Sequence, residues 1–140
     1  MKRVAITGAS GYVARNLIQR CVTAGLDVVG ISRSVSNDSA NSIVNVRDYL
    51  DGDQLYKILA GVDTVFHLAA QVHRQEPTEV KGVAEYWKAN VDSVTSLAKA
   101  SQKAGVRRFV FLSSVAVNGE STTVKPFRAE DLPRPAGLYG

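Results

Sequence analysis

The stretch that decides the fold is VAITGASGYVARNL, residues Val4 to Leu17, close to the start of the chain. Its apolar beginning leads directly into the turn TGASG at residues 7–11, and a helical pattern follows at once. Glycine adopts backbone angles that other residues avoid and lets a ligand approach the main chain closely. The first amides of a helix lack partners within it, and the helix dipole adds partial positive charge there. The stretch therefore predicts a pyrophosphate site; the alternative is a turn that only packs a strand on a helix.

The composition is that of a single globular domain. Of the 140 residues, 45% are hydrophobic and 21% charged, which is enough for a core without disulfides. The net charge of +4 is scattered and forms no basic stripe, which disfavours a nucleic-acid partner and suits an anionic small molecule. Cys21 falls on the apolar side of the first predicted helix, which favours a buried thiol over a nucleophile.

The opening of the chain does not resemble a secretory signal. The apolar run after Met1-Lys2-Arg3 stops at Thr7-Gly8, which is far too short for the hydrophobic region of a signal peptide. No stretch approaches the length of a membrane span. The cytoplasm is therefore the expected compartment, with no membrane partner.

Apolar bursts alternate with helical periodicities along the chain. Strands that are apolar on both faces and separated by helices indicate a parallel sheet covered on both sides. Right-handed crossovers then give a Rossmann-like, doubly wound α/β sheet with strand order 3-2-1-4-5. Strands are predicted at residues 3–7, 27–32, 43–46, 63–68 and 107–112, helices at 11–24, 51–60 and 81–104, and a loop at 34–42.

The same patterns predict which side chains face the core. Gly25 is expected to end the first helix and Asp53 to cap the second. One apolar face of the first helix is predicted to hold Tyr12, Leu17, Cys21 and Val22, and one stripe of the longest helix to hold Val83, Trp87, Val91, Val94 and Ala98. From Asn118 onward the pattern dissolves, and KPFRAEDLPRPAGLYG at 125–140 contains three prolines. We therefore expect one dinucleotide-binding domain over 1–140, the N-terminal portion of a longer protein, truncated before the last strands and the substrate-binding part.

Five motifs in register resemble the extended short-chain dehydrogenase/reductases. TGASGYVA at 7–14 is similar to the fingerprint T-G-x-x-G-x-x-G/A, HLAA at 67–70 to H-x-A-[AG], and SSVAVNG at 113–119 to S-[ST]-x-x-V-Y-G. Asn90 resembles the asparagine of the family's long helix, and Tyr139-Gly140 the start of Y-x-x-x-K. This superfamily includes the nucleotide-sugar epimerases, dehydratases and 4-ketoreductases. The resemblance implies hydride transfer at a sugar carbon with NAD or NADP, as in a UDP-glucose 4-epimerase, and no metal.

The resemblance also assigns roles. Tyr139 would take the proton of a sugar hydroxyl as phenolate, and Ser114 would hold the oxygen while its charge changes. A phenol needs a nearby cation to ionise at neutral pH, and the lysine of the motif would come four residues after Tyr139. We therefore expect no appreciable turnover from these 140 residues alone. The residues expected around the cofactor are Gly8, Ser10, Gly11, Tyr12, Val13, Ser32, Arg33, Asn45, Val46, Leu68, Ala69, Ala70, Asn90 and Ser113.

Two departures from the family pattern bear on the cofactor. NAD-preferring relatives carry an acidic residue after the second strand, whereas this chain has Ser32-Arg33-Ser34. A guanidinium and hydroxyls suit a 2′-phosphate, which favours NADP; an arginine exposed in a loop is the alternative. Asn45-Val46 stands where relatives often place Asp against adenine, and the Asn carbonyl still accepts a hydrogen bond.

Each candidate side chain also has a purely structural interpretation. Ser113 and Ser114 are typical of groups that satisfy backbone at a strand end, and Tyr139 of a surface residue. Their joint placement at strand ends, where open α/β sheets bind ligands, favours the catalytic interpretation. His67 lies inside an apolar strand, which favours a hydrogen-bonded core histidine, and His73 is expected in a loop near the cofactor.

Other functions remain open at this stage. A non-catalytic NAD(P)-binding regulatory or scaffold module has the same fold but no need of Ser114 and Tyr139. Among the enzymes, Ser32-Arg33 favours a ketoreductase that exchanges NADPH, while the motifs in general resemble the epimerases. Relatives dimerise through the long helix, so residues 81–104 are a candidate homodimer interface.

Overall fold

The computed structural model describes residues 1–33, 42–72, 79–122 and 125–140. These residues form two compact units. The first comprises Met1–Ala70 and Val91–Leu112, and the second Gln71–Asn90 and Ser113–Gly140. The first unit holds the sheet and the glycine-rich turn. His73 and residues 34–41 of the predicted loop lie outside the described residues. Ser42, the last residue of that predicted loop, is described and begins a strand.

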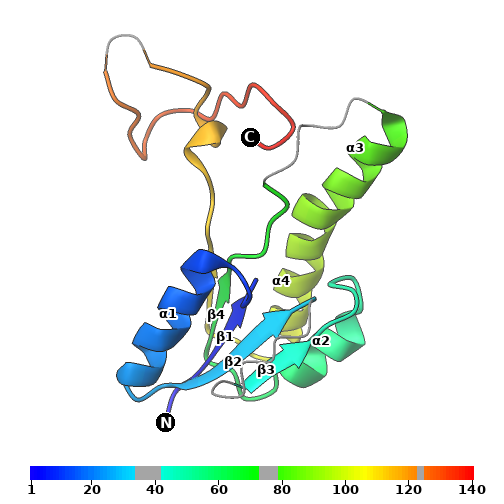
Figure 1. Ribbon diagram of the computed structural model, residues 1–140, viewed down its shortest axis with the longest axis vertical. Helices are drawn as coiled ribbons and strands as arrows, with labels where there is room; N and C mark the ends of the chain where they lie inside the picture. The colour runs from blue at the N-terminus through cyan, green and yellow to red at the C-terminus, as the bar shows by residue number, and fades with distance from the viewer. Residues whose placement is uncertain (34–41, 73–78, 123–124) are drawn as a thin grey trace. The chain divides into compact units, whose positions relative to one another are not determined.

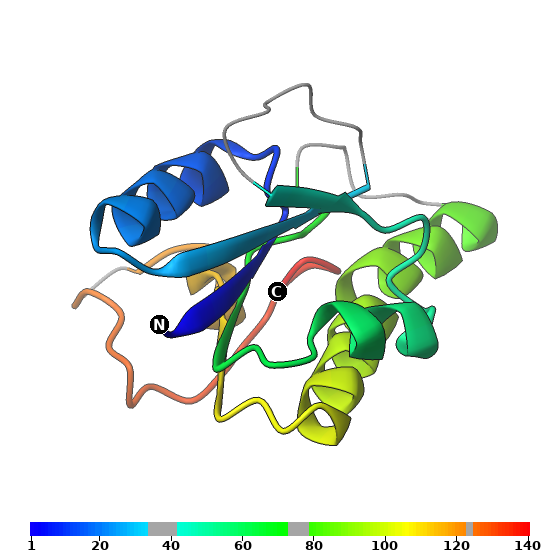
Figure 2. The same ribbon diagram turned by 90° about the horizontal axis from the view of Figure 1, so that it is seen from below.

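The first unit is built on a five-stranded parallel sheet in the order β3-β2-β1-β4-β5, as predicted. Helix α1 covers one face of this sheet, and α2 and α4 cover the other (Figures 1 and 2). The strands are β1 (Arg3–Thr7), β2 (Asp27–Ser32), β3 (Ser42–Asn45), β4 (Thr64–His67) and β5 (Arg108–Phe111). The helices of this unit are α1 (Tyr12–Thr23), α2 (Gly52–Ile58) and α4 (Ser93–Lys103).

Successive residues of β1 point to opposite faces, so the sheet supports a core on each side. Val4 and Ile6 pack with α1, whereas Ala5 packs with α2 and α4. The expectation of full coverage is wrong at β5, where Val110, Phe111 and Leu112 are exposed. An edge strand has a neighbour on one side only, so its side chains lose the shelter that a second strand provides.

The predicted face of α1 is partly wrong. The buried residues are Ala14, Ile18 and Cys21, which recur at i, i+4 and i+7, whereas Tyr12 is 85% exposed and Val22 is also exposed. Tyr12 opens the helix at the edge of the sheet, and Val22 lies one position past the buried stripe. The burial of Cys21 is confirmed, and burial raises the pKa of its thiol.

The long helical run is confirmed in extent but not in its buried face. It consists of α3 (Val80–Trp87), the π-helical segment η1 (Lys88–Asp92) and α4. Trp87 and Val91, from the predicted stripe, are exposed. The buried face of α4 instead consists of Ser93, Leu97, Ala100 and Ser101. Small side chains let the helix approach the sheet, and the Ser101 hydroxyl is satisfied by donating to the Leu97 carbonyl at 2.7 Å, so polarity does not prevent burial.

The cap of α2 lies two residues before the predicted one. Asp51, not Asp53, accepts a hydrogen bond from the Gln54 amide at 2.9 Å. Asp53 lies in the first turn and pairs with Lys103 at 3.8 Å on the surface. A cap must precede the helix to reach its free amides, so Asp53 is already too far along the chain.

The cap assignment predicts a difference between two neighbouring aspartates. Asp51→Ala is expected to lower the free energy of unfolding by about 1 kcal/mol, the usual value of a helix cap. Asp53→Ala is the matched control and is expected to cost less than about 0.5 kcal/mol, because it removes only an exposed ion pair. Urea unfolding of both variants measures the difference, and equal losses would contradict the assignment.

The second unit contains α3 and a short 3-10 helix, η2 (Val115–Val117), followed by irregular chain. The prediction that regular structure ends near Asn118 is confirmed. The Arg134 amide donates to the Val117 carbonyl at 2.8 Å and ties this segment back to η2. Of the helices within the described ranges, none is long and apolar enough to cross a membrane.

Candidate dinucleotide site

The glycine-rich turn joins β1 to α1 with the geometry that the sequence predicts. Gly8 has φ +68°, which favours glycine, and the Gly11 amide donates to the Gly8 carbonyl at 2.7 Å. No side chain in the described part of the chain caps α1, so the first amides of this helix are available to a ligand. On the exposed side of the turn, the Arg15 side chain donates two hydrogen bonds to the Ser10 carbonyl, at 3.0 and 2.8 Å.

A cavity of about 520 Å³ lies over this turn, at the carboxyl ends of β1, β2 and β4. This is where open α/β sheets bind ligands, and the size falls in the usual range for such sites. Among the described residues that line it, none carries a carboxylate. The lining consists of Gly8, Ser10, Gly11, Ser32, Arg33, Leu68, Ala69 and Ala70, all expected there, together with Tyr49.

The structure places the other candidates of the first unit around the cavity rather than in its lining. Tyr12 and Val13 lie in the exposed first turn of α1, and neither side chain lines the cavity. Val46 is fully buried, and its amide donates to the Ser32 carbonyl at 2.9 Å. Asn45 donates to the Arg33 carbonyl at 3.1 Å. Asn45 and Val46 therefore support the segment that carries Ser32 and Arg33.

The hydroxyls near Arg33 form a small polar group. Ser32 is buried, and its hydroxyl donates to the Ser10 hydroxyl at 3.3 Å. This contact links the end of β2 to the glycine-rich turn. Arg33 is exposed and lines the same cavity. Two hydroxyls and one guanidinium, with no carboxylate in the described lining, form a favourable environment for a phosphate.

Thr7 and His67 fix the segment that follows β4 and lines the cavity. The Thr7 hydroxyl accepts from the Leu68 and Ala69 amides at 3.1 and 3.2 Å and lies 2.8 Å from Nδ1 of His67. Because this hydroxyl accepts two bonds and has one proton, it donates that proton to Nδ1. The ring of His67 is therefore neutral with its own proton on Nε2, and the geometry of Leu68 and Ala69 depends on this bond.

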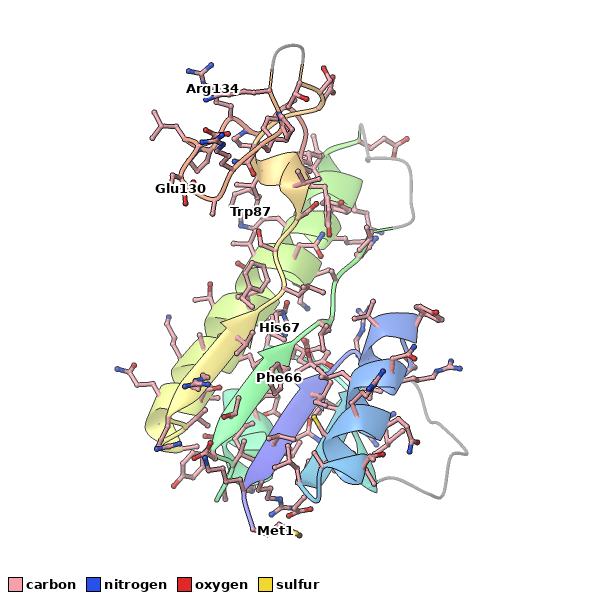
Figure 3. All side chains as sticks on the ribbon, turned by 90° about the vertical axis from the view of Figure 1, so that its left-hand side faces the viewer. Met1, Phe66, His67, Trp87, Glu130 and Arg134 are labelled. Atoms are coloured by element: carbon pink, nitrogen blue, oxygen red, sulfur yellow. The ribbon has the colours of Figure 1, made fainter. Side chains whose placement is uncertain are left out.

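His67 itself is a core residue, as interpreted from the sequence. It is fully buried beside Phe66 on β4 (Figure 3), and the rings of Tyr49, Phe109 and Phe111 surround it. Burial lowers the pKa of His67 to about 4. Nε2 has no hydrogen-bond partner among the described residues, so protonation of the ring would leave a buried charge without compensation.

The remaining candidates lie in the second unit. Asn90, within η1, accepts from the Gln71 amide at 2.8 Å and donates to the Gln71 carbonyl at 3.2 Å. This amide pair fixes the segment that follows Leu68-Ala69-Ala70 in the chain. A π-helical turn exposes or re-aims side chains and is frequent at functional sites. Asn90 is thus bonded to main-chain atoms of its own unit.

Ser113 and Ser114 line a cavity of about 390 Å³ within the second unit. The Ser114 hydroxyl accepts from the Ala116 amide at 3.2 Å and caps η2, so its proton is free to be donated to another group. A Cβ at Gly140 would lie 2.6 Å from the Ala116 carbonyl oxygen. The end of the chain, with the half-buried Tyr139, is thereby beside the helix that Ser114 caps.

Comparison with known proteins places these features in a family. A sequence model described as the NAD dependent epimerase/dehydratase family matches residues 4–140. The chain belongs to the NAD dependent epimerase/dehydratase family. Family membership confirms the resemblance to extended short-chain dehydrogenase/reductases that five motifs indicated. Within the described residues, no cluster of three or more His, Cys, Asp or Glu side chains is suited to hold a metal ion.

Similar members of the family differ in their named activities. The chain is 32% identical to a UDP-glucose 4-epimerase of Vibrio cholerae over 99% of its own length and 43% of the relative. It is 33% identical to a 3-beta-hydroxysteroid dehydrogenase of Mycolicibacterium neoaurum, over 93% and 39%. Among solved structures, MoeE5 in complex with UDP-glucose and NAD has a TM-score of 0.80 and 33% identity, over 99% and 44%. The chain thus spans less than half the length of these relatives.

Two residues of the site were missed in the sequence. Thr7 lies inside the fingerprint, but its side-chain role requires knowledge of where β4 pairs with β1. Tyr49 comes four residues after β3 and reaches the cavity from a loop. Its position after a strand could have identified Tyr49, because a residue just beyond a parallel strand lies at the same edge of the sheet as the glycine-rich turn.

Proposed function

We propose that this chain is the NAD(P)-binding portion of a nucleotide-sugar 4-epimerase or 4-ketoreductase. The observation that carries the proposal is the cavity over an uncapped helix, lined by eight residues that were expected around a dinucleotide. MoeE5, a structural neighbour at 33% identity, is in complex with UDP-glucose and NAD. When bound, the nicotinamide cofactor supplies the hydride chemistry, and the protein supplies position.

The fit of the cofactor rests on the backbone. A side chain at Gly8 would fill the cradle, because a Cβ there would lie 3.0 Å from Ala69 main-chain atoms. The amides at the start of α1 bind the pyrophosphate. Leu68, Ala69 and Ala70 pass beside the ribose and the nicotinamide side. Ser10, Ser32 and Arg33 hold the 2′-phosphate of NADP, which makes NADP the preferred cofactor.

The proton chemistry belongs to Ser114 and Tyr139. Tyr139 exchanges a proton with the sugar hydroxyl, and Ser114 donates a hydrogen bond to the oxygen as negative charge develops. Ser114 is held for this by the Ala116 amide. We assign the helical run that contains the exposed Trp87 and Val91 to a homodimer interface, and the protein to the cytoplasm.

A second substrate class has a specific observation in its favour. One similar relative is named a 3-beta-hydroxysteroid dehydrogenase, and Ser114 with Tyr139 suits the oxidation of any secondary alcohol. A sterol hydroxyl is therefore the alternative to the sugar hydroxyl. Saturation binding of UDP-glucose and of a 3β-hydroxysteroid to the cofactor-loaded full-length protein separates the two.

Cofactor choice is tested through Arg33. Calorimetric titration of the chain is expected to show tighter binding of NADP than of NAD. Arg33→Ala is expected to weaken NADP about tenfold, the usual value of a charge-assisted phosphate contact, and to change NAD less than about twofold. Arg47→Ala is the matched control, because Arg47 is exposed and does not line the cavity.

The outcomes test the NADP preference and the dinucleotide site separately. Equal loss of NAD and NADP in the Arg33 variant would overturn the NADP assignment while leaving the site intact. Failure of the unmodified chain to bind either dinucleotide would overturn the site.

A further inference from the structure

Tyr49 connects the hydrophobic core to the cofactor cavity. Its side chain is only 6% exposed and belongs to the core cluster of Leu55 and Leu59 under the α2 face of the sheet. The turn that contains it is closed by a bond from the Leu50 amide to the Asp48 carboxylate at 3.0 Å. The ring of Tyr49 lies edge-on to His67, with centroids 6.5 Å apart. Packing therefore fixes the direction in which the phenol points.

The hydroxyl of Tyr49 ends at the glycine-rich turn. It donates to the Ile31 carbonyl at 3.2 Å and lines the cavity together with Gly8. The same Ile31 carbonyl accepts from the Ala9 amide at 3.1 Å. Tyr49 and the turn after β1 thus share one acceptor near the carboxyl end of β2. Burial raises the pKa of Tyr49, against smaller lowering effects of Gly8 and Arg33, so the group is a neutral phenol at neutral pH.

We infer that Tyr49 is a positioning residue for the pyrophosphate of the cofactor. Its hydroxyl holds the Ile31 carbonyl where that carbonyl accepts from the Ala9 amide, which keeps the turn in the conformation that presents its amides to the ligand. The inference rests on the proposed dinucleotide site. Phenylalanine has the same ring and fills the same core volume, so only the hydroxyl performs this role.

Tyr49→Phe provides the test, with Tyr56→Phe as the matched control. Tyr56 lies on α2 with its ring near Lys103, outside the cavity. Loss of one hydrogen bond is expected to weaken NAD and NADP about fivefold each. Binding of 2′-AMP, which has no pyrophosphate, is expected to be unchanged. Tyr56→Phe is expected to change none of the three affinities.

Hydrogen exchange provides a readout that does not depend on ligand. In Tyr49→Phe the Ala9 amide is expected to exchange about fivefold faster, while the Leu55 amide within α2 keeps its rate. A structural role in the core alone would change both amides or neither.

A wrong dinucleotide site and a wrong role for Tyr49 give different results. If the unmodified chain binds neither NAD nor NADP, the dinucleotide site is wrong. If it binds both and Tyr49→Phe binds them equally well, or loses 2′-AMP to the same extent, only the role of Tyr49 is overturned. Unchanged exchange at the Ala9 amide also overturns it.

Discussion

Gly8→Ala is expected to abolish measurable binding of NAD and NADP and to lower the free energy of unfolding by about 3 kcal/mol. Two effects add. Alanine at φ +68° costs about 1 kcal/mol of backbone strain. The new Cβ would also lie 3.0 Å from the Cα and N atoms of Ala69 and 3.1 Å from the carbonyl carbon of Leu68. These are main-chain atoms, so no side-chain rotation relieves the contact.

The displacement at Ala69 spreads because Thr7 holds that segment. The Thr7 hydroxyl accepts from the Leu68 and Ala69 amides, and a shift of either amide weakens a buried bond. The same movement narrows the cavity that the cofactor occupies in our proposal. Calorimetry with NAD and NADP measures the binding loss, and urea unfolding measures the stability loss.

Gly25→Ala is the matched control for Gly8. Gly25 has φ +72°, but a Cβ there would meet no atom within 4 Å. The control therefore isolates the strain, with an expected cost of about 1 kcal/mol and unchanged dinucleotide affinity. If Gly8→Ala destabilises no more than Gly25→Ala, the close approach of the turn to Ala69 is refuted.

The second large effect is acid destabilisation through His67. In the unfolded chain this histidine takes up a proton near pH 6.5, whereas in the fold its pKa is lowered to about 4. Between these values the unfolded state binds more protons, so stability falls as pH falls. The expected slope is up to about 1.4 kcal/mol per pH unit, and the total loss about 3 kcal/mol. Urea unfolding at a series of pH values measures it.

His67→Gln is expected to flatten the stability profile between pH 6.5 and 4, although its stability at pH 7 is lower. The unmodified protein, measured in parallel, is the control and keeps the slope. The pKa of Asp63 is lowered first by its bond to Arg107, and its stabilising contribution is lost only below pH 3.8, outside this window. An imidazole of His67 that titrates near pH 6.5 in the folded protein would contradict the prediction.

Much of the fold follows from local pattern. Each central strand is a continuous apolar run, and glycines mark the ends of α1 and α4, at Gly25 and Gly105. Parallel strands joined by helices permit few topologies, so the strand order and the place of the cavity were predictable. The lining agrees with this, because eight of its nine residues lie in the turn, at the last position of a predicted strand or just beyond one.

Errors arose where burial depends on a partner distant in the chain. The buried face of α4 includes Ser93 and Ser101, since their small side chains fit against the sheet and Ser101 bonds within its own helix. A search for apolar periodicity does not identify buried serines. The exposure of Trp87 and Tyr12 has the same origin, because a large apolar side chain is buried only where another element covers it.

What residue order settled here was the set of strands and helices, the conformation demanded at Gly8 and the family to which the chain belongs. These are short-range properties: backbone sterics, periodicity and motifs read within a few residues. What required three dimensions was the link from Thr7 to His67 and Ala69 and the reach of Tyr49 to Ile31. Those bonds join residues that only the pairing of strands brings together, and no local pattern encodes a hydrogen bond spanning 60 residues.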